Sequence, residues 1–75
     1  MSEQFLWSTA LIELGPSLEN YDKNIWTEEE IYTIYAIMNA YDGTSVPDTK
    51  CGSCRRHAIA RVRNIWHTFK NQQKL

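Results

Sequence analysis

The chain has 75 residues, of which 43% are hydrophobic and 12% aromatic, and its formal net charge is −1. This length suits one domain with one small core, and this composition favours folding over disorder. No run of the sequence comes near the roughly 20 apolar residues of a membrane span, and no basic segment opens the chain. We therefore expect a single domain over residues 1–75, made in the cytoplasm, with no membrane partner.

The charges are divided between the two parts of the chain. Residues 1–48 hold nine acids and one base, whereas residues 49–75 hold seven bases and no acid. Either acidic and basic helices pack side by side and neutralise each other, or the basic part faces an external polyanion or an acidic protein surface. We favour internal neutralisation, because charged faces are usually solvated or balanced within the chain.

The first predicted helix covers residues 3–14, from an N-cap at Ser2 to a stop at Gly15 and Pro16. Its apolar residues lie all round the helix and not in one stripe, which indicates burial on more than one side. Because so small a chain has little core to supply that burial, we predict that residues 1–14 complete the core or dock on another chain. The partner-binding residues of this helix would be Phe5, Trp7 and Leu11.

A long polar connector over residues 16–26 leads to the second predicted helix, residues 28–42. Thr27 and Glu30 have the spacing of a capping box, and Gly43 suits the left-handed position after a helix. The predicted core between the second and third helices is Ile31, Ile34, Tyr35, Met38, Ala58, Val62, Ile65 and Phe69. Further residues that the helical spacing adds to this face are Tyr32, Ile37 and Tyr41.

The third predicted helix covers residues 50–71, after a loop in which Pro47 prevents the second helix from continuing. Cys51 lies seven residues before Ala58 and Cys54 lies four before it, so both extend the apolar stripe of this helix. Our favoured interpretation is that they are buried thiols that pack as small hydrophobic residues.

Two other interpretations of the cysteines stay open. With His57 they provide three zinc ligands, but a structural zinc site needs four, and His67 lies about 15 Å further along a continuous helix. Cys-Gly-Ser-Cys at a helix N-terminus is also typical of thiol–disulfide exchange, although the chain offers no strand pattern and no substrate groove. We predict no catalytic residue, no cofactor and no small-molecule substrate; if zinc is bound, its ligands are Cys51, Cys54 and His57.

The basic residues of the third helix provide an alternative function. The spacing places five of them on one side, and we call this set the basic stripe: Arg56, Arg63, His67, Lys70 and Lys74. Such a stripe can follow a phosphate backbone, and three helices ending in a basic one resemble helix-turn-helix proteins. However, the loop over residues 43–49 is longer than the turn of that motif. The residues predicted to meet a protein or nucleic-acid partner are Arg56, Arg63, Lys70 and Lys74.

One stretch of the sequence resembles a known group of proteins. The stretch contains Ile34-Tyr35, Asn39, Gly43 and the run Cys51-Gly52-Ser53-Cys54-Arg55-Arg56. It resembles short proteins encoded by tailed bacteriophages, in which a helix ending near a glycine precedes a Cys-Gly-x-Cys-like element that opens a basic helix. The resemblance implies an accessory or virion-associated protein and transfers no catalytic residue.

Together these features predict an all-α fold, a small bundle of three main helices. For function they predict a non-enzymatic protein-interaction module inside a larger assembly such as a virion, with nucleic-acid binding through the basic helix as the alternative.

Overall fold

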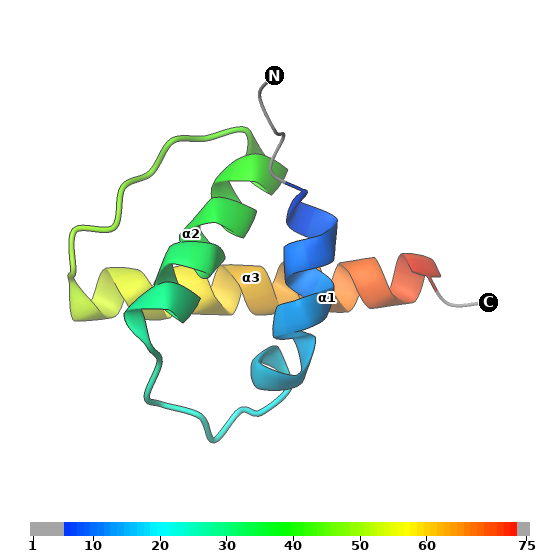
Figure 1. The fold of residues 1–75 in the computed structure, drawn as a ribbon, viewed down its shortest axis with the longest axis horizontal. Helices are drawn as coiled ribbons and strands as arrows, with labels where there is room; N and C mark the ends of the chain where they lie inside the picture. Colours follow the sequence, from blue (N-terminus) through cyan, green and yellow to red (C-terminus); the bar gives the residue numbers. More distant parts are fainter. Residues whose placement is uncertain (1–5, 74–75) are drawn as a thin grey trace.

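The computed structural model describes residues 6–73, and within them the chain forms three helices. These are α1 (Trp7–Leu18), α2 (Glu28–Asp42) and α3 (Gly52–Gln73). Figure 1 shows α1 and α2 crossing the same side of α3, and each of the three helices contacts the other two. The predicted all-α class and the arrangement of three main helices are confirmed. No helix within residues 6–73 has the length and apolar character needed to cross a membrane.

The bounds of α2 are those predicted, because residues at both of its ends fix them locally. The Thr27 hydroxyl accepts a hydrogen bond from the Glu30 N–H at 3.0 Å, and the Glu30 carboxylate accepts one from the Thr27 N–H at 2.9 Å. These two bonds are the predicted capping box. At the other end Gly43 has a left-handed φ of 69°, and the Thr44 N–H donates to the Asn39 carbonyl at 3.0 Å.

α1 runs about one turn past its predicted end. Gly15 and Pro16, the predicted stop, lie inside the helix, which ends at Leu18. Pro16 removes one helical hydrogen bond, but the added turn buries Leu18 completely. A Cβ on Gly15 would lie 2.6 Å from Cζ2 of Trp66, so this glycine lets α1 approach α3 closely. The predicted stop is wrong because core burial outweighs the local signal, and the connector shortens to residues 19–27.

α3 begins and ends two residues later than predicted. The late start has a local cause, because Lys50 has a left-handed φ of 63° that a helix does not include. An Asp48 carboxylate oxygen accepts a hydrogen bond from the Lys50 N–H at 2.9 Å and holds this turn. The predicted first helix includes Leu6, but Leu6 has extended backbone angles, φ −97° and ψ 94°, and α1 begins at Trp7. The predicted N-cap, Ser2, lies outside the described residues.

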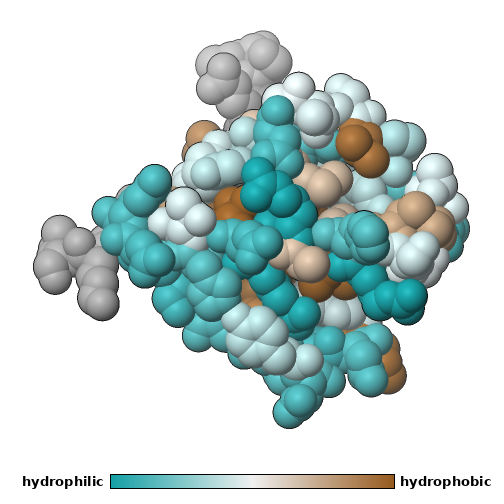
Figure 2. Space-filling view, turned by 180° about the vertical axis from the view of Figure 1, so that it is seen from behind, coloured by the Kyte–Doolittle hydropathy of each residue, from teal (hydrophilic) through white to brown (hydrophobic). Residues whose placement is uncertain are grey.

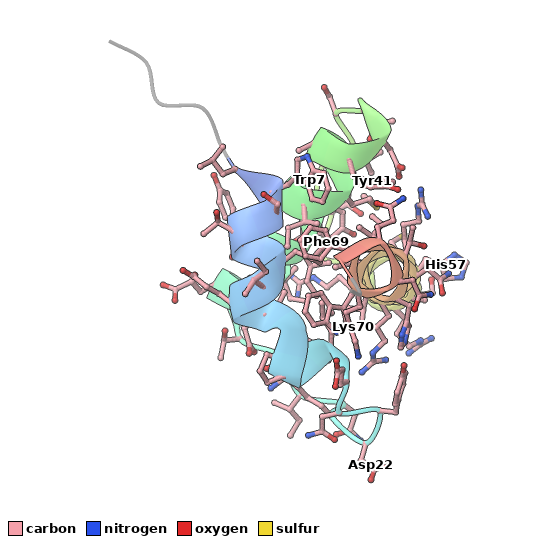
Figure 3. All side chains as sticks on the ribbon, turned by 90° about the vertical axis from the view of Figure 1, so that its right-hand side faces the viewer. Trp7, Asp22, Tyr41, His57, Phe69 and Lys70 are labelled. Atoms are coloured by element: carbon pink, nitrogen blue, oxygen red, sulfur yellow. The ribbon has the colours of Figure 1, made fainter. Side chains whose placement is uncertain are left out.

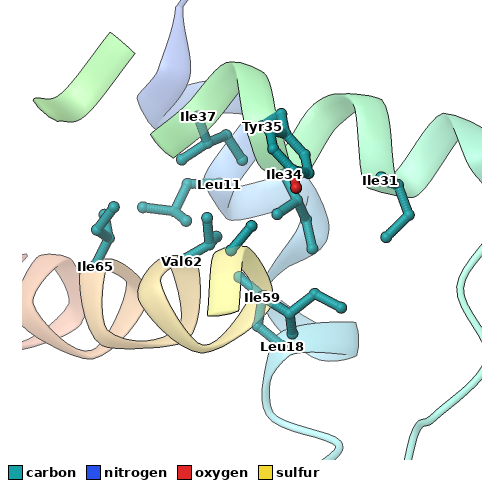
Figure 4. Packing of buried hydrophobic residues seen from close by; sticks show 10 residues of the cluster. Leu11, Leu18, Ile31, Ile34, Tyr35, Ile37, Ile59, Val62 and Ile65 are labelled. Atoms are coloured by element: carbon teal, nitrogen blue, oxygen red, sulfur yellow. The ribbon is translucent and has the colours of Figure 1, made fainter. Parts of the chain in front are cut away.

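Apolar side chains from all three helices form the core (Figure 4). The buried ones are Leu11, Leu18, Ile31, Ile34, Tyr35, Ile37, Ala58, Ile59, Val62 and Ile65. Of the predicted core, Met38 and Phe69 are only partly buried and pack against this cluster. Tyr32, which the spacing added to the core face, is 75% exposed because it lies off the packed side of α2. Tyr41, added in the same way, is 39% exposed and lies near the end of the helix, where its ring packs against Trp7. Leu11 and Leu18 show that α1 completes the core.

Candidate functional site

Arg63 of the basic stripe binds the end of α1 and the connector. Its guanidinium donates to the Leu18 carbonyl at 2.9 Å and to the Asn20 carbonyl at 3.0 Å. These carbonyls lie where α1 ends, so a cation there satisfies acceptors that the helix leaves unpaired. The same guanidinium lies over the rings of Tyr21 and Trp26, 4.9 and 5.8 Å from their centroids. Arg63 therefore holds the connector to α3.

His67 and Lys70 continue this contact further along α3. The His67 ring stacks on Tyr21, with 6.2 Å between centroids, and its Nε2 is hydrogen-bonded to the Tyr21 hydroxyl. Lys70 Nζ and Trp66 Nε1 donate to the Glu19 carboxylate at 2.5 and 2.8 Å. These two bonds, Lys70 first, lower the pKa of Glu19. The connector thus lies along the basic stripe and occupies three of its five residues.

The remaining stripe residues are Arg56, which is exposed, and Lys74, which lies outside the described residues.

Two arginines outside the predicted stripe pair with acids of the first part of the chain. Arg55 contacts Asp48 at 2.7 Å and Glu28 at 3.2 Å. Arg61 contacts Asp42 at 2.6 Å. The Arg55 hydrogen bonds hold the pKa of Asp48 at about 2, and the Arg61 bonds likewise lower the pKa of Asp42. The predicted internal neutralisation is confirmed for these pairs. Sequence reasoning missed Arg55 and Arg61 because the pairs depend on the loop conformation and on the packing of α2 against α3.

The cysteines lie at the start of α3, where a thiol sulfur occupies the place of a capping oxygen. The Cys51 carbonyl accepts from the Arg55 N–H at 2.9 Å, and the Cys51 Sγ accepts from the Cys54 N–H at 3.3 Å. The Ser53 hydroxyl lies 3.3 Å from the same sulfur. Hydrogen bonds from Cys54 and Ser53 lower the pKa of the Cys51 thiol to about 7. The pKa of the Cys54 thiol is raised, chiefly by its hydrogen bond with Cys51.

The prediction that both thiols are buried is wrong. Cys51 is half-buried and Cys54 is exposed. The physical reason is visible in Figure 1, where the first turn of α3 extends beyond α2 and no helix covers it. His57 points away from the other two helices (Figure 3), and in residues 6–73 no three His, Cys, Asp or Glu side chains converge on a possible metal site. Cys51, Cys54 and His57 are therefore not brought together as the zinc ligands considered above.

Asn39 fixes the loop between α2 and α3, a role that its sequence context did not indicate. Its side-chain amide donates to the Val46 carbonyl at 2.9 Å, and its side-chain oxygen accepts from the Val46 N–H at 3.0 Å. The Thr44 hydroxyl donates to the same oxygen at 2.8 Å. One side chain thus pairs with both main-chain polar groups of Val46 and fixes the loop at this residue.

This loop borders two hollows. The first, of about 490 Å³, lies between α2 and the loop, and we call it the α2–loop groove; it is lined by Glu28, Tyr32, Tyr35, Ala36, Asn39, Val46, Pro47 and Asp48. The second, of about 590 Å³, lies between the loop and the start of α3, where Cys54 and His57 line it together with Met38 and Val46. Neither hollow was predicted, because loop conformation does not follow from residue spacing.

The residues predicted to dock from the first helix lie in different surroundings. Leu11 is 0% exposed and belongs to the core, so it is corrected from a docking residue to a packing residue. Trp7 is half-buried and packs edge-on against Tyr41 and Phe69, with centroids 5.1 and 6.0 Å apart (Figure 3). Phe5 lies outside the described residues.

The face of the molecule behind α1 and α2 is mostly hydrophilic, with small separate apolar patches (Figure 2). This is the side on which α3 has no helix against it (Figure 1). The chain matches no protein-family model, no curated protein and no solved structure.

Proposed function

We propose that this chain is a non-enzymatic protein-recognition module that binds an apolar segment of a partner protein in the α2–loop groove. The observation that carries the proposal is the exposure of two large apolar side chains in one hollow. Tyr32 and Val46 are 75% and 47% exposed, and both line the α2–loop groove. Exposed apolar side chains beside a hollow are a common feature of recognition surfaces.

The groove is also held in shape before any partner binds. Asn39 fixes the main chain of Val46 through two hydrogen bonds, and Arg55 fixes Asp48 at the other end of the loop. A surface that is already ordered loses less conformational entropy on binding, which favours affinity. The two acids that line the groove, Glu28 and Asp48, both pair with Arg55, so the partner segment we expect is apolar and uncharged.

The assembly we propose is a phage virion or a complex associated with it. This part of the proposal is supported by the likeness of the Cys-Gly-x-Cys element and the basic helix to those of short tailed-bacteriophage proteins. A recognition role of this kind needs no catalytic group and no cofactor.

A photo-crosslinking residue placed at position 32 tests the groove in the cells that make the protein. Position 25 is the matched control, because Ile25 is 81% exposed but belongs to the connector and not to the groove. We expect a discrete cross-linked protein from position 32 and not from position 25. With that protein purified, Tyr32→Ala and Val46→Ser should each weaken binding about tenfold, whereas Ile25→Ala should leave it unchanged. Equal cross-linking from both positions, or equal binding by all three variants, would contradict the proposal.

Nucleic-acid binding is the second candidate, and one observation favours it. Lys23, Arg55, Arg56 and Arg63 line a hollow of about 540 Å³ together with Trp26. Because Arg55 and Lys23 also pair with acids and Arg63 with carbonyls, we expect only weak binding of free DNA.

A salt titration of duplex and single-stranded DNA binding separates the two candidates. Each lysine or arginine that contacts a phosphate contributes about one unit to the log–log salt slope. Sub-micromolar binding at physiological salt, weakened stepwise by neutralising Arg56, Arg63, Lys70 and Lys74, would favour nucleic acid over a protein partner.

A further inference from the structure

We propose that Cys51 and Cys54 form a dithiol that exchanges with a disulfide substrate, with Cys51 as the attacking thiol and Cys54 as the resolving thiol. The product is an intrachain disulfide at the start of α3. This activity goes beyond the recognition role and does not depend on it.

The position of Cys51 suits the attacking role. Its sulfur lies at the N-terminal end of a 22-residue helix and accepts a hydrogen bond from the Cys54 N–H at 3.3 Å. The first turn of α3 contains no acid, and Arg55 and Arg56 follow Cys54 directly. The positive end of the helix and this hydrogen bond both favour the thiolate, which is the nucleophile in disulfide exchange. The pKa of about 7 agrees with this geometry.

The position of Cys54 suits the resolving role. It lies one turn after Cys51, and the Cys51 sulfur already lies against its main chain. Because Cys51 precedes the helix, closure of the disulfide requires rotation of the two side chains and not unwinding of α3. Cys54 is exposed and lines the hollow of about 590 Å³ with Met38 and Val46. The hollow leaves room beside the resolving thiol, and Cys51 does not line it. The chain has no strand pattern, but disulfide exchange depends on the two thiols and not on a β-sheet.

The exchange proceeds in two steps, written for a substrate RS–SR. The Cys51 thiolate attacks one sulfur, forms a Cys51–SR bond, breaks the S–S bond and releases RS⁻, which takes a proton from solvent. The Cys54 thiol then gives its proton to solvent and attacks the Cys51 sulfur, which forms the Cys51–Cys54 bond and releases a second RS⁻. The two cysteines are oxidised by two electrons in total, and the substrate is reduced to two thiols.

The relative reactivity of the two cysteines follows from their thiolate fractions. At pH 7 a thiol with a pKa of about 7 is half ionised, whereas a thiol at the ordinary value of about 9 is about 1% ionised, and the pKa of Cys54 is raised above that value. The more basic thiolate is the better nucleophile. With a Brønsted slope of about 0.45, this difference in nucleophilicity reduces the advantage that Cys51 has from its larger thiolate fraction by roughly eightfold. Cys51 should therefore react about fivefold to tenfold faster than Cys54.

The test uses the full reduced chain with oxidised glutathione at pH 7, followed by mass spectrometry. We expect the wild-type chain to lose two hydrogen atoms and to retain no glutathione. Cys54→Ser should instead accumulate a stable mixed disulfide at Cys51. Cys51→Ser should form the mixed disulfide at Cys54 about fivefold to tenfold more slowly. Circular dichroism of both variants shows whether each is folded.

A measurement on the unmodified sequence keeps the test decisive if a variant unfolds. Competitive alkylation of the wild-type chain, with peptide mapping, should label Cys51 about fivefold to tenfold faster than Cys54. Equal labelling of the two cysteines would overturn the proposal. Accumulation of a mixed disulfide in the wild-type chain, or reaction only after a chelator is added, would overturn it as well.

Discussion

The starts of α2 and α3 both have backbone N–H groups without a partner inside the helix, and different atoms accept their hydrogen bonds. At the start of α2, oxygens of Thr27 and Glu30 accept the free N–H groups, and three acids fill the first turn. At the start of α3, the sulfur of Cys51 accepts the Cys54 N–H, and the first turn has no acid. Both arrangements satisfy the helix end, but only the second leaves a nucleophile at its positive pole.

Arg55 joins the two starts in space. It belongs to the first turn of α3, and its guanidinium contacts Glu28 in the first turn of α2 and Asp48 before α3. The two helix starts therefore lie side by side, but α2 already buries Ile31 in its first turn, whereas the first turn of α3 is uncovered. Exposure as well as the capping atom distinguishes them. The difference teaches that an oxygen cap stabilises a helix, whereas a sulfur cap also prepares a reaction.

The largest expected effect comes from the close contact between α1 and α3, which lies away from both starts. Gly15→Ala places a Cβ against the Trp66 ring and should destabilise the fold by about 1–3 kcal/mol. Gly52→Ala is the matched control, because nothing lies within 4 Å of the added atom. Urea unfolding measures both. The ratio of Cys51 to Cys54 alkylation should stay the same in Gly15→Ala under native conditions; a changed ratio would show that the helix starts are not local features.

The next effect is loss of the oxygen cap of α2. Thr27→Ala removes the acceptor for the Glu30 N–H and should destabilise the fold by about 1 kcal/mol. Thr33→Ala removes a hydroxyl within the same helix, which donates only to the Glu29 carbonyl. Because alanine favours the helix, this control should be neutral or slightly stabilising. Equal destabilisation by the two variants in urea unfolding would show that the capping box is not what stabilises the start of α2.

Some helix ends could be predicted from the sequence and others could not, because some are fixed by local contacts and others by packing between helices. Thr27, Glu30 and Gly43 act within a few residues of themselves, so the bounds of α2 follow from the sequence. The end of α1 depends on the burial of Leu18 and the contact of Gly15 with Trp66, which no local pattern contains.

The candidate site is less predictable for a related reason. The spacing places Cys54 on the apolar side of α3, but its exposure depends on how far α2 reaches along that helix. Three residues of the basic stripe, Arg63, His67 and Lys70, share a side of α3, since all three contact the end of α1 or the connector. Their partners Glu19 and Tyr21 belong to the connector, and the path of the connector cannot be derived from residue spacing.

Acid should weaken the ion pair that joins the two starts. Hydrogen bonds from Arg55 hold the pKa of Asp48 at about 2, below the roughly 3.9 of an unfolded aspartate. The unfolded chain therefore binds the proton more readily, so the contribution of Asp48 to stability is complete above about pH 4 and is lost as the pH falls toward 2. Asp48→Asn should lower stability at pH 7 and should reduce the loss of stability between about pH 4 and 2. Urea unfolding of both proteins across this range measures the difference, and parallel pH curves would contradict it.

The smallest expected effect on stability, and the sharpest test of the comparison, comes from exchanging the capping atoms. Cys51→Ser replaces sulfur with a better capping oxygen and should leave the unfolding midpoint unchanged or slightly raised, while it removes the reactive thiol. In a chain whose two native cysteines are serine, Thr27→Cys places a thiol at the start of α2. There Glu28, Glu29 and Glu30 surround it with negative charge and should raise its pKa, so it should be alkylated about fivefold more slowly at pH 7 than Cys51 in Cys54→Ser. Neutralising the three acids to glutamine should restore much of that rate. If the new thiol reacts as fast as Cys51 while the acids are present, then any helix start activates a thiol, and the sequence around Cys51 has no special part in its reactivity.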